Sequence, residues 1–144
     1  MPMREYCDFT LIADTLDPNN ESNRAFTVQV FTSPVGEGSS IQRSISNELQ
    51  QYLVQQEERE LDMDGIIQLG ELLGDLLLPT PVRELFYRSL DKLKPEQGLR
   101  LRLRLAPALA DIPWEYLHIQ RDSEGKDATG FLVLDPRISV VRHE

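Results

Sequence analysis

The sequence predicts a single α/β domain, and three observations support this fold class. Residues 99–105 alternate leucine and arginine without interruption, as a strand with one buried face requires. Three segments between residues 45 and 93 repeat apolar side chains at helical spacing. The chain has 144 residues, 40% of them hydrophobic, which is enough to build a core without disulfides. We therefore expect amino-terminal strands, then three helices, then further strands.

Two strands are expected in the amino-terminal part. Residues 6–13 and 26–30 both alternate apolar and polar side chains, and the turn-rich segment 14–23 separates them. This arrangement predicts a hairpin with a long loop. Residues 33–40 are rich in glycine, serine and proline and predict a second loop, which leads into the first helix.

The three helices are expected over residues 45–53, 66–76 and 82–93. Carboxylates precede the second helix and favour its amino-terminal dipole, and Pro79 follows its end. Thr80 is the expected N-cap of the third helix, with Pro81 as its first residue.

The carboxy-terminal part is expected to begin with the strand 99–105, which we place at the centre of the sheet. Pro113 should open a short helix over residues 113–117, and a polar loop should follow. Residues 131–134 and 138–141 are then expected to pair as a closing hairpin around the turn at 135–137. These patterns suggest a strand-and-helix subdomain over 1–97 and a second segment over 98–144, which together form one compact unit.

Composition limits the classes of partner. A net charge of −9 repels phosphate backbones, so nucleic acid is not an expected partner. No apolar stretch is long enough to span a membrane, and the first residues do not form a signal peptide, so we expect a cytoplasmic protein. Cys7 is the only cysteine, which leaves no disulfide and no zinc or iron-sulfur spacing, and no cofactor is expected.

Two segments resemble binding loops only weakly. Gly36-Glu37-Gly38 follows a strand and precedes an expected helix, but it lacks the third glycine or the lysine of phosphate-binding loops, so we interpret it as a plain loop. The acidic run from Glu57 to Asp64 lacks the remaining ligands of a calcium loop, and we interpret it as a solvated helix start.

Candidate catalytic side chains are also better explained by structural roles. His118 and His143 have no nucleophile or carboxylate at a suggestive spacing, so both are expected at the surface or terminus. Cys7 lies on the apolar side of its strand and should behave as a small hydrophobe.

The strongest surface feature is an arginine stripe formed by Arg100, Arg102 and Arg104. It could receive an acidic partner or pair with this chain's own carboxylates, and we favour internal pairing. Trp114 is expected to anchor the core, and Glu115 is interpreted as a structural residue at a helix start.

The order of these elements resembles one known family. The alternating strand 99–105, the motif Ile112-Pro113-Trp114-Glu115-Tyr116-Leu117 and the segments 131–134 and 138–142 occur in the order found in CHAT domains. CHAT domains are bacterial caspase-like peptidases, often joined to tetratricopeptide repeats. The resemblance covers Ile66 to Arg142 well and the first strands only loosely.

The resemblance implies a caspase-like sheet and cysteine-peptidase ancestry. In the family, a His-Gly motif and a small-residue motif with the cysteine follow the part present here, and neither motif occurs in residues 1–144. No catalytic residue is therefore carried over to this chain, His143 included. Pro113, Trp114 and Glu115 match the family motif and are expected to pack the short helix against the sheet.

The leading hypothesis is that the chain is the amino-terminal scaffold of a CHAT-type cysteine peptidase and has no activity by itself. Its partner would be the carboxy-terminal catalytic segment. The alternatives are a free-standing adaptor that docks another protein through a sheet edge or the arginine stripe, and a structural domain that recruits a larger assembly. A homodimer is also expected if a strand edge is left open.

Overall fold

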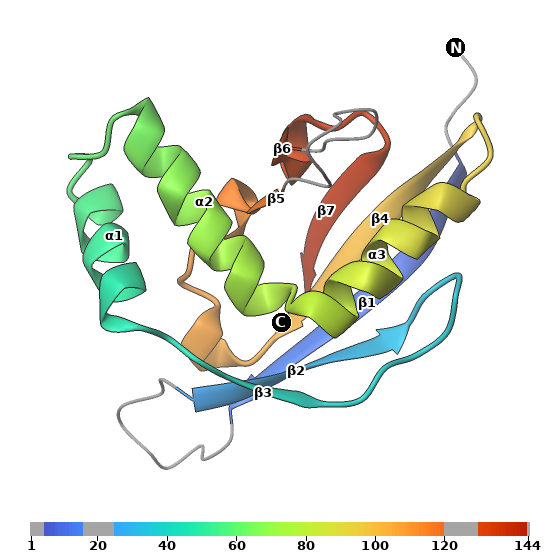
Figure 1. The fold of residues 1–144 in the computed structure, drawn as a ribbon, viewed down its shortest axis with the longest axis horizontal. Coiled ribbons are helices and arrows are strands. Elements are labelled where there is room, and N and C mark those ends of the chain that lie inside the picture. Colours follow the sequence, from blue (N-terminus) through green and yellow to red (C-terminus); the bar gives the residue numbers. More distant parts are fainter. Residues whose placement is uncertain (1–4, 16–24, 120–129, 144) are drawn as a thin grey trace.

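The computed structural model describes residues 5–15, 25–119 and 130–143, and it has the predicted α/β fold. Five strands form a mixed sheet, and two short strands form a separate small hairpin (Figure 1). In chain order the elements are β1 (Glu5–Thr15), β2 (Ala25–Thr32), β3 (Ile41–Ser44), α1 (Asn47–Glu57), α2 (Met63–Leu77), α3 (Thr80–Lys92), β4 (Gln97–Leu105), the 3-10 helices η1 (Pro107–Leu109) and η2 (Trp114–Tyr116), β5 (His118–Ile119), β6 (Gly130–Phe131), the 3-10 helix η3 (Leu132–Leu134) and β7 (Ile138–His143).

The order of strands in the sheet is β3-β2-β1-β4-β7. The predicted hairpin of β1 and β2 is confirmed, because these strands pair antiparallel. The segment that joins them, 16–24, lies outside the described residues. β4 lies inside the sheet as predicted, parallel to β1 on one side and to β7 on the other, although β1 is the middle strand. Segments 1–97 and 98–144 thus share one sheet, and their boundary falls at the start of β4.

Strand β3 was not predicted. It pairs antiparallel with β2 along Ala25–Val28, and only four residues belong to it. Its sequence, Ile-Gln-Arg-Ser, is too short for alternation to distinguish it from a loop. The loop containing Gly36 therefore leads into a strand, and the strand-loop-helix context of a phosphate-binding loop is absent there.

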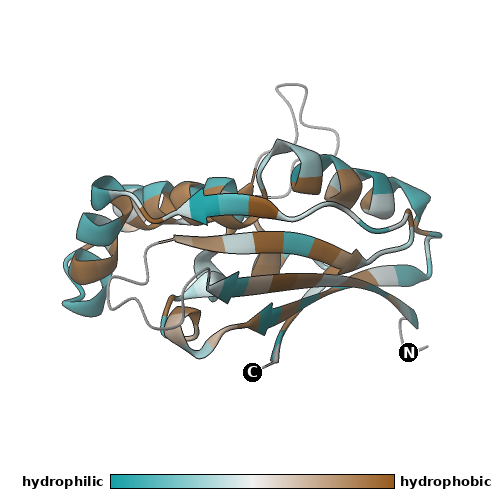
Figure 2. Cartoon of the chain, turned by 90° about the horizontal axis from the view of Figure 1, so that it is seen from below, coloured by the Kyte–Doolittle hydropathy of each residue, from teal (hydrophilic) through white to brown (hydrophobic). Residues whose placement is uncertain are grey.

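The three predicted helices are confirmed, with small shifts at their ends. The side chains of Ser46 and Asp62 cap α1 and α2 by accepting hydrogen bonds from the N–H groups of Leu49 and Gly65. In α3 the N-cap is Pro79, one residue earlier than predicted. Along α3, hydrophobic and hydrophilic bands alternate, as an amphipathic helix on a sheet requires (Figure 2).

The closing hairpin predicted for residues 131–134 and 138–141 is wrong. Residues 132–134 form η3, Phe131 pairs with His118 in the small hairpin, and β7 instead joins β4 in parallel. The Asp135 carboxylate accepts hydrogen bonds from the backbone and guanidinium N–H groups of Arg137. These bonds stabilise the turn between η3 and β7. Short apolar runs on both sides of Asp-Pro do not show which strand they join.

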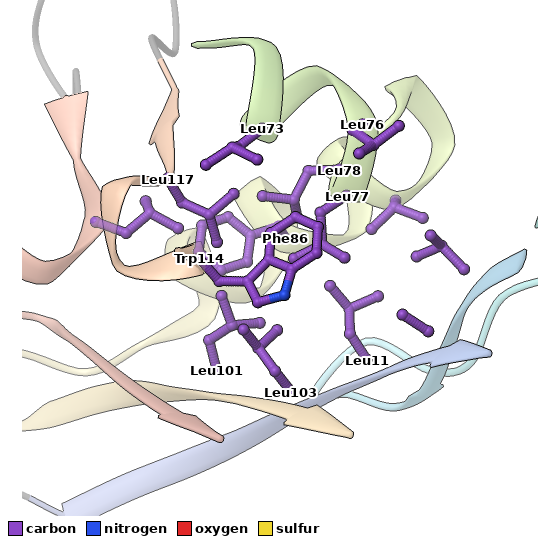
Figure 3. Packing of buried hydrophobic residues seen from close by; sticks show 14 of the residues in the cluster. Leu11, Leu73, Leu76, Leu77, Leu78, Phe86, Leu101, Leu103, Trp114 and Leu117 are labelled. Carbon is purple, nitrogen blue, oxygen red and sulfur yellow. The ribbon is translucent and has the colours of Figure 1, made fainter. Parts of the chain in front are cut away.

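One hydrophobic core lies between the helices and the sheet. The leucines of β4 at positions 99, 101 and 103 are fully buried, as the alternation predicted. Trp114 and Phe86 lie between the leucines of α2 and those of β4 (Figure 3). Trp114 is fully buried, and its indole N–H donates to the Leu109 carbonyl at 3.0 Å, so its predicted role as a core anchor is confirmed.

Candidate interaction site

The outer edge of β7 is the first candidate site. Among the described residues β7 has a sheet partner, β4, on one side only. The Leu99 N–H donates to the Arg137 carbonyl, and in a parallel ladder this register turns the backbone groups of residues 139 and 141 toward β4. The backbone groups of Val140 and Arg142 must then point away from the sheet, where another strand can pair with them.

Arg142 holds this edge strand to the preceding segment. Its guanidinium contacts both carboxylate oxygens of Glu115, at 2.5 and 2.7 Å, and donates to the carbonyls of Ala110 and Ile112 at 2.6 and 2.7 Å. The hydrogen bond from Arg142 lowers the pKa of the Glu115 carboxyl below its ordinary value of 4.5, although partial burial acts in the opposite direction.

Glu115 therefore has a more specific role than a helix-start carboxylate. Its ion pair with Arg142 joins the Pro113-Trp114-Glu115 segment to β7, and Trp114 fixes the same segment in the core. Pro113 was predicted to be the first residue of this helix. It is instead the N-cap of η2, which begins at Trp114. No local pattern in the sequence indicates a role for Arg142, because its partner Glu115 lies 27 positions away.

The arginine stripe is the second candidate site. Arg100 and Arg102 both approach the carboxylate of Asp8 on β1, at 3.6 and 3.5 Å, so the favoured internal pairing is confirmed for these two. The Arg100 guanidinium also lies 5.3 Å from the centre of the Tyr6 ring. Arg104 is exposed and has no ion pair among the described residues.

His118 was expected at the surface and is instead buried, with 8% of its area exposed. Its ring meets Phe131 edge-on at 4.8 Å, and its Nδ1 lies 4.0 Å from a Glu71 oxygen and has no hydrogen-bond partner among the described residues. The surface prediction failed because β5 lies close against α2: a Cβ on Gly70 would lie 2.8 Å from the Cβ of His118. The spacing of Gly70 and Gly74 on one helix face was a signal for this close approach.

The other candidates keep structural roles. Cys7 is half-buried against the core, as predicted. The acidic run 57–64 is exposed except at Leu61, and Asp62 caps α2, so its second half lies at a helix start as interpreted, whereas Glu57 is the last residue of α1. Gly36 occupies a turn at φ 115° in a plain loop. His143 is the last residue of β7.

Within the part of the chain that the structure describes, no helix is long and apolar enough to cross a membrane. In the same part, no cluster of three or more histidine, cysteine or acidic side chains could hold a metal ion. Comparisons with protein-family models, with curated proteins and with solved structures find no match for the chain. The fold and the contacts described above are therefore the basis for any proposed function.

Proposed function

We propose that this chain is the amino-terminal scaffold of a CHAT-type, caspase-like cysteine peptidase of the cytoplasm, and that it is not catalytic by itself. The observation that carries the proposal is the parallel series β1, β4 and β7, which ends at an edge strand with outward-pointing backbone groups. A caspase-like sheet carries its histidine and cysteine on successive parallel strands, and β7 offers the edge to which such a strand can be added.

The ion pair between Glu115 and Arg142 supports the same proposal. The backbone of Arg142 lies on the open edge of β7, and its side chain binds the Glu115 carboxylate. The family-motif segment therefore fixes the position of β7, the strand with which an added strand would pair. A rigid edge pairs with an incoming strand at a lower entropic cost than a mobile one. This is a structural role for Pro113, Trp114 and Glu115 and requires no chemistry from them.

The first test is the native reading frame after Glu144. A downstream His-Gly motif followed by a cysteine motif would support the proposal. A stop codon at that position would contradict the peptidase parentage and favour the adaptor, which would use the same edge for another protein.

The second test uses proline to block the edge. We expect Val140→Pro to abolish binding of the encoded downstream segment, or of the adaptor's partner, because it removes an outward N–H and leaves the β4 ladder intact. Val141→Pro is the matched control for folding, since it removes an N–H that faces β4 and should lower the melting temperature. Co-expression followed by size-exclusion chromatography measures binding. Unchanged binding by a folded Val140→Pro variant would show that the partner does not add a strand at β7.

A further inference from the structure

The face of the sheet opposite the leucines is open in the described structure. The β1–β4 register places Asp8, Thr10 and Ile12 beside Arg100, Arg102 and Arg104 on this face, which we call the arginine face. α3 packs on the opposite face, and the Arg100 and Arg102 side chains are 42% and 37% exposed. Tyr6, which is 36% exposed, shares the arginine face.

The arginine face has a surplus of positive charge, unlike the whole chain, because its three arginines outnumber the carboxylates of Asp8 and Asp14. Three guanidiniums stand at alternate positions of β4, about 6.6 Å apart along the strand. The Asp8 carboxylate is shared between two of them at distances of 3.5 Å or more, and an exposed pair of this kind contributes about 0 to 1 kcal/mol. Stability therefore does not explain why a chain of net charge −9 concentrates arginines here.

Parallel strands are rarely left open on one face, because the connections between them normally cover both. An apolar helix cannot cover the arginine face without burying the guanidinium of Arg104, which has no ion pair among the described residues, and this burial is costly. A covering element must therefore carry carboxylates. Next to Arg104, residues 12–14 and 104–106 line a shallow depression of about 200 Å³, which has room for side chains of such an element.

A strand added beyond β7 leaves the arginine face available. Connections between parallel strands are right-handed, so strands added in one direction have their connections on one face. The connections from β1 to β4 and from β4 to β7 contribute α3 and Trp114 to the core on the leucine face. A further strand in the same direction would bring its connection to the leucine face too.

We propose that the arginine face binds an acidic amphipathic helix of a protein partner. Glutamates at every fourth position of a helix are about 6 Å apart, close to the spacing of the arginines. Apolar residues beside them would contact Tyr6 and Ile12. Arginine forms bidentate hydrogen bonds with carboxylates, and this geometry selects side chains of that shape. The overall negative charge disfavours nucleic acids and anionic membranes as the occupant.

The test is a titration of the whole chain with a labelled helix-forming peptide that has glutamate at every fourth position and leucine beside it. The variant Arg100→Gln, Arg102→Gln, Arg104→Gln should fold normally and lose at least about tenfold in affinity. The matched control, Arg59→Gln, Arg88→Gln, Lys94→Gln, removes the same charge from exposed positions elsewhere and should bind like the wild type. Fluorescence anisotropy measures binding, and rising salt should weaken it.

Three outcomes would overturn the proposal. One is the absence of saturable binding, and another is an equal loss in the control variant, which would show a response to net charge only. The third is tighter binding of anionic vesicles or DNA than of the peptide, which would assign the face to a different class of partner. A peptide with glutamine in place of glutamate should not bind.

Discussion

Leu101 and Leu103 lie fully buried on β4, and each separates two arginines on the opposite face. We expect Leu101→Asp or Leu103→Asp to unfold the domain, because each loses about 1.5 to 3 kcal/mol of apolar burial and also buries a carboxylate. Arg102→Gln, between them, is the control and should change stability by about 1 kcal/mol or less. Thermal melts followed by circular dichroism measure both. A cooperative melt of either aspartate variant near the wild-type temperature would contradict this placement of the core.

The Glu115–Arg142 pair predicts a dependence of stability on pH. Because Arg142 lowers the pKa of Glu115 in the folded state, the pair stabilises the protein above the unfolded value, near 4.5. That contribution is lost as the pH falls through the lower, folded pKa. We expect Glu115→Gln to reduce the acid-induced loss of stability between about pH 5 and 3, measured by urea unfolding at each pH. Equal pH profiles for wild type and variant would show that the pair does not contribute.

At the residue scale, sequence patterns identified side chains whose environment depends on near neighbours. The alternation of β4 predicted which leucines are buried, and the large hydrophobic area of Trp114 indicated that it anchors the core. The burial of His118 and the partner of Glu115 depend on contacts with α2 and β7, which lie far away in the sequence. Local periodicity contains no information about such contacts.

At the scale of elements, the contact of α2 with η2 and β5 depends on two glycines. A Cβ at Gly70 would overlap the Tyr116 carbonyl, and one at Gly74 would lie 2.7 Å from the His118 carbonyl. We expect Gly70→Ala to lower the free energy of unfolding by about 1 to 3 kcal/mol. Gly65→Ala, in the first turn of the same helix, would place its Cβ 2.9 Å from the flexible end of Leu61 and 3.3 Å from the capping Asp62 carboxylate, and should change stability by about 1 kcal/mol or less. Chemical denaturation compares the two, and equal effects would contradict the close contact.

Two arginines from other elements bind the carbonyl groups at the carboxy-terminal end of α2. The last turn of α2 has no basic residue, yet Arg43 of β3 donates to the carbonyls of Asp75 and Leu76, and Arg83 of α3 donates to that of Leu78. These cations satisfy carbonyls at the negative end of the helix dipole. Because Arg43 belongs to a strand that the pattern did not reveal, this capping could not be predicted from sequence.

At the scale of the whole molecule, the fold class followed from the sequence but the pairing of the last strands did not. Periodicity separates helix from strand and identifies a buried face, which was enough for an α/β sheet with three helices. The choice between a hairpin and a parallel β7 depends on competition between two possible partners for the same short apolar run. Residues 138–143 pair with β4, because in this position the buried Ile138 extends the core formed by the leucine face of β4.

The two proposed surfaces should respond to salt in opposite directions. Pairing through the β7 edge brings together two chains of net charge −9, so their mutual repulsion opposes association and added salt should strengthen it. Binding of an acidic helix to the arginine face is an attraction between opposite charges, which salt should weaken. We therefore expect the chain alone to dimerise more strongly as salt rises, and Val140→Pro to remain monomeric throughout.

Sedimentation at several protein and salt concentrations measures this dimerisation. The glutamine variant of the three arginines is the control, and it should dimerise through β7 no better than the wild type at high salt, where charge effects are screened. A peptidase assay on the same samples should show no hydrolysis. A dimer that weakens with salt and disappears in the glutamine variant would place the self-association on the arginine face. In that case the edge of β7 would not be the surface through which this scaffold assembles, even though the backbone groups of Val140 and Arg142 are unpaired in the described structure.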